Sequence, residues 1–500
     1  MELRGRKVLV MGAARSGIAS ARFLAQREAI VALNDRKPLD EWPAEALDLK
    51  SEGVGCVAGE VPSWLLDQID LAVISPGVPS KSIPVRYVER RGVEVIGEIE
   101  LASRFLRGRI VAITGTNGKT TTTSLIGQML KDAGMKVQVG GNIGTPLISM
   151  IESSHHDGWN VVEVSSFQLE TIVDFHPTVA AVLNVTPNHM DRYESLMDYA
   201  AAKHRIFMNQ TVSDVAILNA DDEIVSSWAA GLRARVVPFS IKRELGEGLF
   251  LKGKELVWRG QAPFLTEHST PGEHFTPAEH STEVEHSRLN DAATRSQDST
   301  EERVLLTREE MQLRGLHNVE NVLAALAVGL ACGAAPESLR RTASEFQPVE
   351  HRLEFVAEIN GVRFFNDSKA TSVDATLKAL EAFAGDAGKI VLILGGRGKK
   401  APYAPLAPLI RERVRKMVLI GEDAAVIETE LKGAAPFEHA TDMQEAVARS
   451  LAAAESGDVV LLAPACASFD MFESFEHRGK VFKEEVSSLK FQVSTSQTGN

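Results

Sequence analysis

The segment from Ile110 to Gly127 constrains this chain more than any other. A short apolar run typical of a β-strand leads into a glycine-rich turn that ends in Lys119, and a run of threonines then opens a helical pattern. Backbone N–H groups of such a turn, at the positive end of a helix, bind polyphosphate. Lys119 would contact the β- and γ-phosphates, and the Thr120 hydroxyl would bind Mg²⁺. The segment therefore predicts a nucleoside triphosphate site made of Gly115, Thr116, Asn117, Gly118, Lys119, Thr120 and Thr121.

One position departs from the general pattern G-x-x-x-x-G-K-[ST]. Ile113 stands where that pattern has its first glycine. The alternative interpretation is an ordinary strand–turn–helix in which Lys119 is a surface lysine. The order of strand, Gly-Lys-Thr and helix favours the phosphate site.

The bulk properties limit the kind of protein this is. A chain of 500 residues exceeds what one hydrophobic core serves, so about three domains are expected. The net charge of −13 argues against nucleic acid as the main partner. The 3 cysteines show no C-x-x-C spacing, which favours a reducing compartment. The longest apolar stretch, residues 322–335, is shorter than the ~20 residues that span a bilayer, so we expect a cytoplasmic protein with no membrane contact.

Strand-like and helix-like segments alternate along most of the chain, which predicts an α/β protein with parallel sheets covered by helices on both faces. Three modules are expected, with new ones starting near residues 108 and 349. The expected strands are residues 7–12, 30–35 and 71–74 in the first module, 160–164 and 179–185 in the second, and 389–396, 416–421 and 458–462 in the third.

The first module resembles a nucleotide-binding unit. Its second strand ends in Asp35, at the spacing that a Rossmann-type unit uses for a ribose. Ala14 replaces the middle glycine of G-x-G-x-x-G, which weakens a dinucleotide interpretation and favours another nucleotide-like ligand. Ser75 begins a Ser-Pro-Gly turn after a further strand, where either a ligand contact or a plain turn is possible.

One segment breaks the α/β pattern. From Glu267 the chain repeats in sixes, and His268, His274, His280 and His286 keep this period. Metal binding by these histidines is one interpretation. Because the segment is acidic, rich in Pro, Ser and Thr and poor in aliphatic residues, we expect instead that residues 267–300 form a disordered insertion. The tail beyond Leu489 is expected to be unstructured too.

Several polar side chains follow expected strands, where ligands of α/β proteins bind. Glu163 ends one strand beside the phosphate turn and is a candidate Mg²⁺ ligand. A polar segment, residues 184–192, follows the next strand, and helix capping by Asn188 or Asp191 is the alternative to ligand binding there. Lys203, taken alone, is expected to be an ordinary solvated lysine. Asn318 and Asn321 are expected on one face at the start of a helix.

In their order along the chain, ten segments resemble the Mur ligases. They are T-G-T-N-G-K-T (114–120), G-G-N-I-G (140–144), E-V-S-S-F-Q-L-E (163–170), N-H-M-D-R-Y (188–193), A-A-K (201–203), H-N-V-x-N (317–321), E-H-R (350–352), N-D-S-K-A-T (366–371), G-G-R-G-K (395–399) and P-A-C-A-S-F-D (464–470). Within this family N-D-S-K-A-T resembles the members that add D-glutamate, since ligases for other amino acids and folylpolyglutamate synthetases carry a D-x-x-H-like element there.

The resemblance implies three domains: a Rossmann-like N-terminal domain for the UDP-sugar (1–107), a central P-loop ATPase domain with a mostly parallel sheet (108–348), and a Rossmann-like C-terminal domain for the amino acid (349–500). It implies that a missing first glycine is normal in the phosphate loop. The implied reaction joins D-glutamate to UDP-N-acetylmuramoyl-L-alanine through an acyl phosphate, giving ADP and phosphate, in cytoplasmic peptidoglycan precursor synthesis. A monomer is expected.

The resemblance also implies roles for individual residues. Two Mg²⁺ ions would be bound by Thr120, Glu163, His189 and a carbamylated Lys203, with Lys119, Glu163, His189 and Lys203 as the catalytic set. ATP would also contact Asn318, Asn321, Arg352 and Asp367. D-Glutamate would contact Lys369, Thr371, Lys399, Ser468 and Phe475, and the UDP-sugar would contact Ser16, Asp35, Arg36, Ser75 and Asn142.

Two positions depart from the family pattern, Arg15 in the first turn and Lys400 after the G-G-R-G-K element. Two other functions stay open from the sequence. One is a ligase of the same superfamily with a different amino acid, and the other is a nucleotide-gated regulatory protein without turnover.

Overall fold

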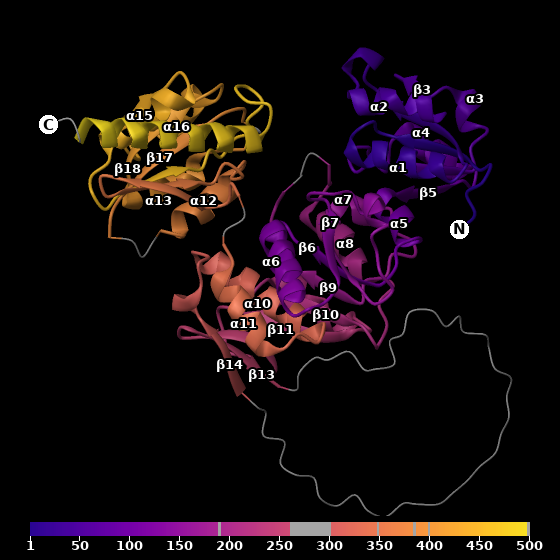
Figure 1. The fold of residues 1–500 in the computed structure, drawn as a ribbon, viewed down its shortest axis with the longest axis horizontal. Helices are drawn as coiled ribbons and strands as arrows, with labels where there is room; N and C mark the ends of the chain where they lie inside the picture. The colour runs from indigo at the N-terminus through magenta and orange to yellow at the C-terminus, as the bar shows by residue number, and fades with distance from the viewer. Residues whose placement is uncertain (189–191, 261–301, 348–349, 384–386, 399–400, 498–500) are drawn as a thin grey trace, which may run out of the picture. The chain divides into compact units, whose positions relative to one another are not determined.

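The computed structural model describes residues 1–500 except 189–191, 261–301, 348–349, 384–386, 399–400 and 498–500 (Figure 1). The chain divides into two compact units, Met1–Glu310 with Glu320–Ser344, and Met311–Val319 with Glu345–Asn500. The described residues form three sheets, of 5, 9 and 6 strands, and most strand pairs are parallel. The predicted α/β class is confirmed. The domain limits at 107/108 and 348/349 stay predictions.

The first sheet is parallel throughout and has the order β3-β2-β1-β4-β5. Because β2 and β3 lie on one side of β1 while β4 and β5 lie on the other, the chain reverses its direction of travel between β1 and β4. Ligands of open α/β sheets bind at such a point. The elements are β1 (Lys7–Met11), α1 (Arg15–Gln26), β2 (Ile30–Asp35), α2 (Ala44–Asp48), β3 (Gly55–Ala58), α3 (Ser63–Leu66), β4 (Leu71–Ile74), α4 (Ile83–Arg90) and β5 (Glu94–Gly97).

Strand β1 is apolar at successive positions because both of its faces are buried. Val8 and Val10 are buried in one core cluster, and Leu9 and Met11 are buried in another. Successive side chains of a strand point to opposite faces, so both faces of this sheet are covered. The strands predicted at residues 7–12, 30–35 and 71–74 are confirmed, with β1 ending one residue early.

Helix α5 (Glu98–Ser103) joins the first sheet to the second. Its Ile99 and Leu101 belong to the same buried cluster as Val8 of the first sheet and Ala112 of the second. Glu100, with 0% of its surface exposed, accepts backbone N–H bonds from residues 173–175 at 2.8–3.1 Å. A buried carboxylate needs such donors, and here they fasten the linker to the central part of the chain.

The second sheet has the order β14-β13-β12-β11-β10-β9-β6-β8-β7, parallel from β7 to β12 and antiparallel at its last two pairs. Its strands are β6 (Arg109–Thr114), β7 (Val137–Gly141), β8 (Trp159–Glu163), β9 (Val179–Val182), β10 (Val215–Asn219), β11 (Arg235–Ser240), β12 (Gly248–Lys252), β13 (Glu255–Arg259) and β14 (Glu302–Thr307). The helices of this part are α6 (Lys119–Asp132), α7 (Ser166–Leu169), α8 (Leu196–His204), α9 (Glu223–Ser227), α10 (Leu316–Ala331) and α11 (Pro336–Glu345).

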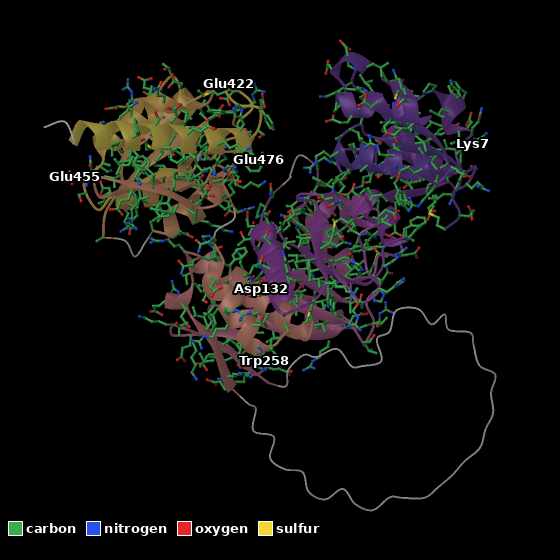
Figure 2. The ribbon with its side chains drawn as sticks, viewed as in Figure 1. Lys7, Asp132, Trp258, Glu422, Glu455 and Glu476 are labelled. Carbon is green, nitrogen blue, oxygen red and sulfur yellow. The ribbon has the colours of Figure 1, made fainter. Side chains whose placement is uncertain are left out.

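A helix contact and an inserted segment accompany the second sheet. Asp132, labelled in Figure 2, ends α6 and accepts a hydrogen bond from Thr342 Oγ1 of α11 at 2.8 Å. The predicted disordered insertion, residues 267–300 with its four spaced histidines, lies outside the described residues. The chain on either side of it forms the adjacent strands β13 and β14.

The third sheet has the order β15-β16-β20-β17-β18-β19, and only β15 runs antiparallel to its neighbour among the described pairs. Its strands are β15 (Glu354–Ile359), β16 (Val362–Asn366), β17 (Ile390–Gly395), β18 (Val414–Ile420), β19 (Phe437–His439) and β20 (Val459–Leu462). Its helices are α12 (Val373–Glu381), α13 (Ala407–Arg413), α14 (Ala424–Glu430), α15 (Met443–Ala453) and α16 (Phe475–Gln497).

The prediction of an unstructured tail beyond Leu489 was wrong, because α16 continues to Gln497. Val486 is fully buried in a core cluster of the third sheet, and Leu489 and Val493 pack against the same cluster. Residues three, four and seven apart lie on one face of a helix, so this sparse apolar stripe is sufficient to hold the helix on the sheet.

In the described part of the chain, no helix combines the length and the apolar character that crossing a bilayer requires. The apolar stretch that begins at Val322 lies in α10, where Val322, Leu323 and Leu326 are fully buried. Its hydrophobicity therefore serves the interior of the protein. Cys56, Cys332 and Cys466 are free thiols.

Candidate functional site

The predicted phosphate loop connects β6 to α6 as expected. Gly118 stands at the position before the first helical residue with φ of +83°, a left-handed conformation that favours glycine. A Cβ atom there would lie 2.2 Å from Asn321 Oδ1, so a side chain would displace the Asn321 side chain or the loop. The loop therefore presents bare backbone at the positive end of a 14-residue helix.

Asn184, which follows β9, holds the loop in shape. Its backbone carbonyl accepts the N–H of Thr116 at 2.9 Å, and its side-chain Oδ1 accepts the N–H of Asn117 at 2.8 Å. Thr116 Oγ1 in turn accepts the N–H of Thr186 at 3.0 Å. The sequence placed Asn184 in a polar segment after a strand but gave it no role, and its spacing from the loop is visible only once β9 lies beside β6.

Lys119 lies over the loop and does not extend into solvent. Its Nζ donates to the carbonyl oxygens of Gly115 and Thr116, each at 2.9 Å. The residue is partly buried. These contacts count against the interpretation of Lys119 as a surface lysine, because an exposed lysine would not fold back over a glycine turn.

Three candidate residues meet at the carboxyl ends of β6, β7 and β8. Thr120 Oγ1 donates to Glu163 Oε2 at 2.9 Å, and Asn142 Nδ2 donates to Glu163 Oε1 at 2.8 Å. The backbone N–H of Asn142 donates to the carbonyl oxygen of Glu163 at 2.8 Å. Glu163 is 2% exposed and pairs in register with Ile113 of β6. A buried carboxylate beside a threonine hydroxyl at a phosphate loop is a donor set that suits Mg²⁺.

The prediction that Lys203 is an ordinary solvated lysine was wrong. Its side chain is 1% exposed, and its Nζ donates to the carbonyl oxygen of Gly115 at 2.8 Å. Burial lowers the pKa of Lys203 well below its usual value, and the nearby charge of Lys119 adds to this, while Glu163 opposes it. Helix α8 carries Lys203 on its inner face because the small residues before it allow the helix to pack closely.

Tyr199 is a site residue that the sequence interpretation missed. It is 2% exposed, its hydroxyl lies 3.4 Å from Thr116 Oγ1, and its ring centroid lies 4.5 Å from Lys203 Nζ. The signal was present, since Tyr199 and Lys203 are four residues apart and therefore share a face of α8.

Asn318 and Asn321 lie in the first turns of α10, as predicted. Asn321 is 5% exposed, and its Oδ1 accepts from Thr122 Oγ1 of α6 at 3.3 Å. Asn318 is 7% exposed and donates from Nδ2 to the carbonyl oxygen of Arg314 at 2.7 Å. Asn321 therefore lies directly behind the phosphate loop.

Apart from Asn142, which follows β7, the candidate UDP-sugar residues lie near the carboxyl ends of β1, β2 and β4. Asp35 Oδ2 accepts the N–H of Ala13 in the glycine turn at 2.8 Å, and Ser75 Oγ donates to the carbonyl oxygen of Gly12 at 3.1 Å. Ser16 is partly buried in the first turn of α1, and Arg36 is exposed. Arg15, the departure from the family pattern, donates to the carbonyl oxygen of Gly144, close to Asn142.

Of the candidate amino-acid residues that the structure describes, Lys369 and Thr371 follow β16, Ser468 follows β20 and Phe475 begins α16. Lys369 Nζ lies 3.7 Å from the ring centroid of Phe475. The N–H of Thr371 donates to the carbonyl oxygen of Lys369 at 2.8 Å. Ser468 is 2% exposed in the loop after β20. Neighbouring parallel strands bring these residues to one edge of the third sheet.

Asp367 and Arg352 lie near the same edge. Burial raises the pKa of Asp367 to about 7, and the positive charge of Arg352 opposes this shift. Arg478 was not identified from the sequence. It is fully buried and donates to the carbonyl oxygens of Ser368 and Cys466, which fastens the two loops that carry Lys369 and Ser468. Burial lowers the pKa of Arg478 to about 10.

His189 and Lys399, together with Asp191 and Lys400, lie outside the described residues. Their predicted positions are therefore not tested.

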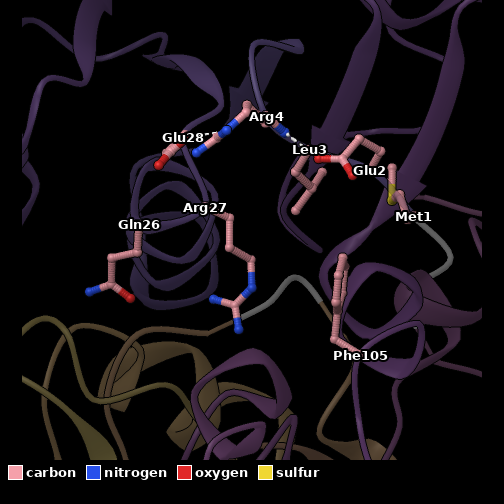
Figure 3. Close-up of a pocket in the computed structure, with 8 residues that line it drawn as sticks. All are labelled: Met1, Glu2, Leu3, Arg4, Gln26, Arg27, Glu28 and Phe105. Atoms are coloured by element: carbon pink, nitrogen blue, oxygen red, sulfur yellow. Dashed lines mark hydrogen bonds and ion pairs between the residues drawn. The ribbon is translucent and has the colours of Figure 1, made fainter.

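Two cavities lie in the first unit. One of about 340 Å³ is lined by Ser80, Glu170, Arg192 and Tyr193 among others, and the Glu170 carboxylate accepts from Ser80 and Tyr193 at 2.6 Å each. The other, of about 300 Å³, is shown in Figure 3, and its lining includes Arg27, whose guanidinium stacks on Phe23. Of the described residues that line these cavities, none belongs to the predicted site.

The geometry of the first unit defines the class of protein. A parallel strand, a glycine turn that ends in Gly-Lys-Thr, and a helix whose N-terminus faces that turn form the phosphate-binding loop of a nucleotide-binding α/β protein.

Comparisons with known proteins identify the family. Residues 6–97 match the model of the Mur ligase MurD-like N-terminal domain, residues 113–329 match the Mur ligase middle domain, and residues 351–466 match the Mur ligase glutamate ligase domain. A UDP-N-acetylmuramoylalanine–D-glutamate ligase of Koribacter versatilis is 44% identical over 98% of this chain and 99% of its own. One of Acidobacterium capsulatum is 45% identical over 97% of each chain. The chain belongs to the Mur ligase family.

Solved structures agree on the fold. A pseudomurein peptide ligase type C from Methanothermus fervidus covers 97% of this chain and 100% of its own with a TM-score of 0.57 at 17% identity. The MurF ligase of Thermotoga maritima, solved in complex with ADP, covers 98% and 99% with a TM-score of 0.57 at 15% identity. At these identities the similarity concerns the fold alone.

Proposed function

We propose that this chain is an ATP-dependent ligase that joins D-glutamate to UDP-N-acetylmuramoyl-L-alanine, releasing ADP and phosphate. Two relatives of that name are similar over nearly the whole chain. The observation that carries the proposal is the cluster at the phosphate loop, where Lys119 and Lys203 both bond to Gly115 and Thr120 bonds to Glu163. Two lysines and a buried carboxylate beside the loop suit a site in which charge moves between phosphate and carboxylate groups, and a phosphate-release assay separates turnover from binding alone.

The reaction balances as two displacements. The substrate carboxylate attacks the γ-phosphorus of ATP, giving an acyl phosphate and ADP. The neutral amine of D-glutamate then attacks the acyl carbon, a tetrahedral intermediate forms, and phosphate leaves while the amine loses its proton. Lys119 neutralises charge on the phosphates, and the N–H groups at the start of α6 orient them, so the chain contributes mainly position and charge.

The residues present fit Mg²⁺. Hydroxyl and carboxylate oxygens are the ligands that this ion takes in phosphate-transfer sites, and Thr120 and Glu163 supply one of each within 2.9 Å of one another. We assign these two residues to the first ion, and Glu163, His189 and Lys203 to a second. When bound, the ions neutralise charge on the phosphoryl oxygens.

We propose that Lys203 carries a carbamate. An amine adds carbon dioxide only in its neutral form, and burial of Lys203 favours that form. Addition of carbon dioxide to this neutral amine releases one proton and gives a buried anion that suits a metal ion. Lys203→Ala should be nearly inactive and partly rescued by a short-chain carboxylic acid. Labelled bicarbonate should give a carbamate NMR signal in the wild type and none in Lys203→Ala. Full activity of Lys203→Ala without rescue would overturn the carbamate.

The substrates are assigned to the two units as follows. Ser16, Asp35, Arg36, Ser75 and Asn142 hold the UDP-sugar, and Asn318, Asn321, Arg352 and Asp367 contact ATP. A dicarboxylic amino acid needs cationic partners when it leaves water, and the C-terminal unit supplies Lys369 and Lys399. Thr371, Ser468 and Phe475 complete that set.

We propose domain limits of 1–107, 108–348 and 349–500, a monomer, and a cytoplasmic location, where the nucleotide-activated precursors of peptidoglycan are made. Light scattering at working concentration tests the monomer, and a mass twice that of the chain would contradict it.

The deciding experiment compares amino acids. Phosphate release with ATP, Mg²⁺ and UDP-N-acetylmuramoyl-L-alanine should require D-glutamate, while L-lysine, meso-diaminopimelate and L-alanine should give no release above background. Release with one of the other amino acids alone would make this a ligase of different specificity. A flat trace with every substrate would favour the regulatory alternative.

A further inference from the structure

Three side chains form a hydrogen-bonded chain beneath the loops that follow β17 and β20. Tyr403 Oη lies 2.8 Å from Asp423 Oδ2 and 3.0 Å from Cys466 Sγ. A carboxylate is the stronger acceptor, so the one hydroxyl proton goes to Asp423 and the Cys466 thiol donates to Tyr403 Oη. Tyr403 is 3% exposed and Cys466 is fully buried. Burial raises the pKa of the Tyr403 hydroxyl, which therefore keeps its proton.

The loop after β20 is supported at Cys466. That residue stands two positions before Ser468, one of the candidate D-glutamate contacts. Between them, Ala467 exchanges backbone hydrogen bonds with Arg397 in both directions, at 2.9 and 3.0 Å. These two hydrogen bonds join Arg397, after β17, to Ala467, after β20, and the Tyr403 hydroxyl bonds the neighbouring Cys466 side chain.

In the loop after β17, Gly398 lies next to the same hydroxyl. A Cβ atom at Gly398 would lie 1.8 Å from Asp423 Oδ2 and 2.8 Å from Tyr403 Oη. The backbone of Gly398 thus lies directly against the Tyr403–Asp423 pair. The N–H of Asp423 also donates to the carbonyl oxygen of Gly396 at 3.0 Å.

On its outer side this loop has an exposed restraint. Arg397 pairs with Glu422, labelled in Figure 2, at 2.8 Å, and both side chains are about half exposed. Exposed ion pairs contribute little, whereas buried and satisfied polar networks fix geometry. Arg478 holds the backbone of the loop after β20 through the carbonyl oxygen of Cys466, and the Tyr403–Asp423–Cys466 chain adds a buried side-chain restraint that reaches both loops.

We propose that Tyr403 is a positioning residue for the amino-acid substrate, whose hydroxyl holds the two loops so that Ser468 keeps the place needed to bind D-glutamate. Tyr403 itself does not touch the substrate. The proposal rests on the proposed function, since it takes D-glutamate to be the substrate of this edge of the third sheet. Tyr403 lies outside the phosphate loop and is not one of the candidate D-glutamate contacts.

The test is Tyr403→Phe, which keeps the ring in the core and removes the hydroxyl. Losing a buried hydrogen bond of this kind corresponds to about a fivefold change in an equilibrium. The KM for D-glutamate should rise about fivefold or more, while the KM values for ATP and the UDP-sugar stay within about twofold. Tyr87→Phe is the matched control, because it removes a hydroxyl that bonds Asp67 at 2.7 Å on the surface of α4. It should leave all three KM values unchanged.

A second variant approaches the chain from its other end. Cys466→Ala removes the thiol that bonds Tyr403 and should raise the KM for D-glutamate in the same selective way. Because both changes break one contact, the effect of the double variant should be smaller than the product of the single effects. If Tyr403→Phe does not fold, as a thermal melt would show, Cys466→Ala carries the test.

The outcomes separate the two proposals. Wild-type activity that requires D-glutamate, with an unchanged D-glutamate KM in the folded variants, overturns the positioning role and leaves the proposed function standing. An equal rise of all three KM values also overturns it, because that pattern indicates general loosening of the fold. Wild-type enzyme that does not use D-glutamate overturns the proposed function itself.

Discussion

Lys119 gives the sharpest prediction for a single residue. Its ammonium lies over the phosphate loop, 2.9 Å from two loop carbonyls, so Lys119→Ala removes the charge nearest to the expected phosphates. Removal of one preorganised charge-stabilising group lowers kcat by about 10²–10³-fold. Steady-state phosphate release measures this loss. Lys131→Ala is the control, since Lys131 is exposed in the last turn of the same helix. Wild-type turnover in Lys119→Ala would remove the phosphate-site interpretation.

The two lysines at the loop show what can be predicted for single residues from sequence. Lys119 belongs to a motif whose spacing predicts a lysine at the phosphates. In the structure its side chain lies over the loop, as expected. Lys203 has no motif of its own, and its local pattern predicted an exposed side chain. Its burial depends on α8 packing beside β6, a contact between segments far apart in the chain. Only the resemblance to a family pointed to it.

At the level of secondary structure, the start of α6 requires glycine at residue 118. Gly118→Ala would combine a φ of +83° with a Cβ atom 2.2 Å from Asn321 Oδ1. We expect weaker ATP binding, seen as a higher KM for ATP, because either the loop or the Asn321 side chain behind it must shift. Gly134→Ala is the matched control, since it has a φ of +80° at the other end of the helix with open space around it. It should cost about 1 kcal/mol of stability and leave the KM for ATP unchanged.

Helix α5 carries a pH-dependent contribution to stability. Burial raises the pKa of Glu98 to about 7, and its Oε1 accepts the N–H of Ile148 at 2.7 Å. At pH values between the ordinary carboxyl pKa of about 4.3 and the raised pKa of Glu98, the folded protein holds a proton that the unfolded chain has released. The free energy of unfolding therefore falls as the pH rises through that window.

Glu98→Gln should remove this fall. Relative to wild type, the variant should gain about 2 kcal/mol in free energy of unfolding between pH ~5 and ~8, measured by urea denaturation at both pH values. Glu89→Gln, on the exposed side of α4, is the control and should follow the wild-type curve. A constant difference between Glu98→Gln and wild type across this range would show that Glu98 does not titrate there.

Helices and strands with strong periodicity were predictable, and weak patterns were not. The strand at residues 30–35 is found with the same limits, because its four apolar residues lead directly into Asn34 and Asp35 at the carboxyl end. The end of α16 was missed, because Val486, Leu489 and Val493 make a thin stripe in an otherwise polar segment. Whether a segment with such a stripe forms a helix depends on the sheet that it packs against. The local sequence carries no information about that sheet.

For the whole molecule, the sheet orders explain why the scattered motifs gather. Parallel strands place their carboxyl ends on one edge, so Lys119 after β6 and Glu163 at the end of β8 come together, as do Lys369 after β16 and Ser468 after β20. The gathering of these residues at one edge of each sheet follows from the alternation of strands and helices in the sequence. The roles of the supporting residues Asn184, Tyr403 and Arg478 could not be predicted in this way. Each of them acts through a neighbour that only the folded chain provides.

The strands on either side of the hexapeptide segment lead to a prediction about the whole chain. Its flanks, β13 and β14, are antiparallel neighbours in which Arg259 pairs with Glu302. Two such strands need only a short turn between them. Arg259 also bonds the Glu302 carboxylate at 2.6 Å, which holds the two ends together. The long connection is therefore not required for the sheet to form.

Deletion of residues 267–300 should accordingly leave kcat and all three KM values within about twofold of wild type, because loop length changes stability only slowly. Phosphate release and a thermal melt measure both properties on the shortened chain. The control replaces the histidines of the same segment with glutamines at full length, which separates loss of length from loss of metal-binding side chains. A large drop in turnover on deletion, reproduced by the glutamine variant, would assign the histidines a part in catalysis and overturn the interpretation of the segment as a passive insertion.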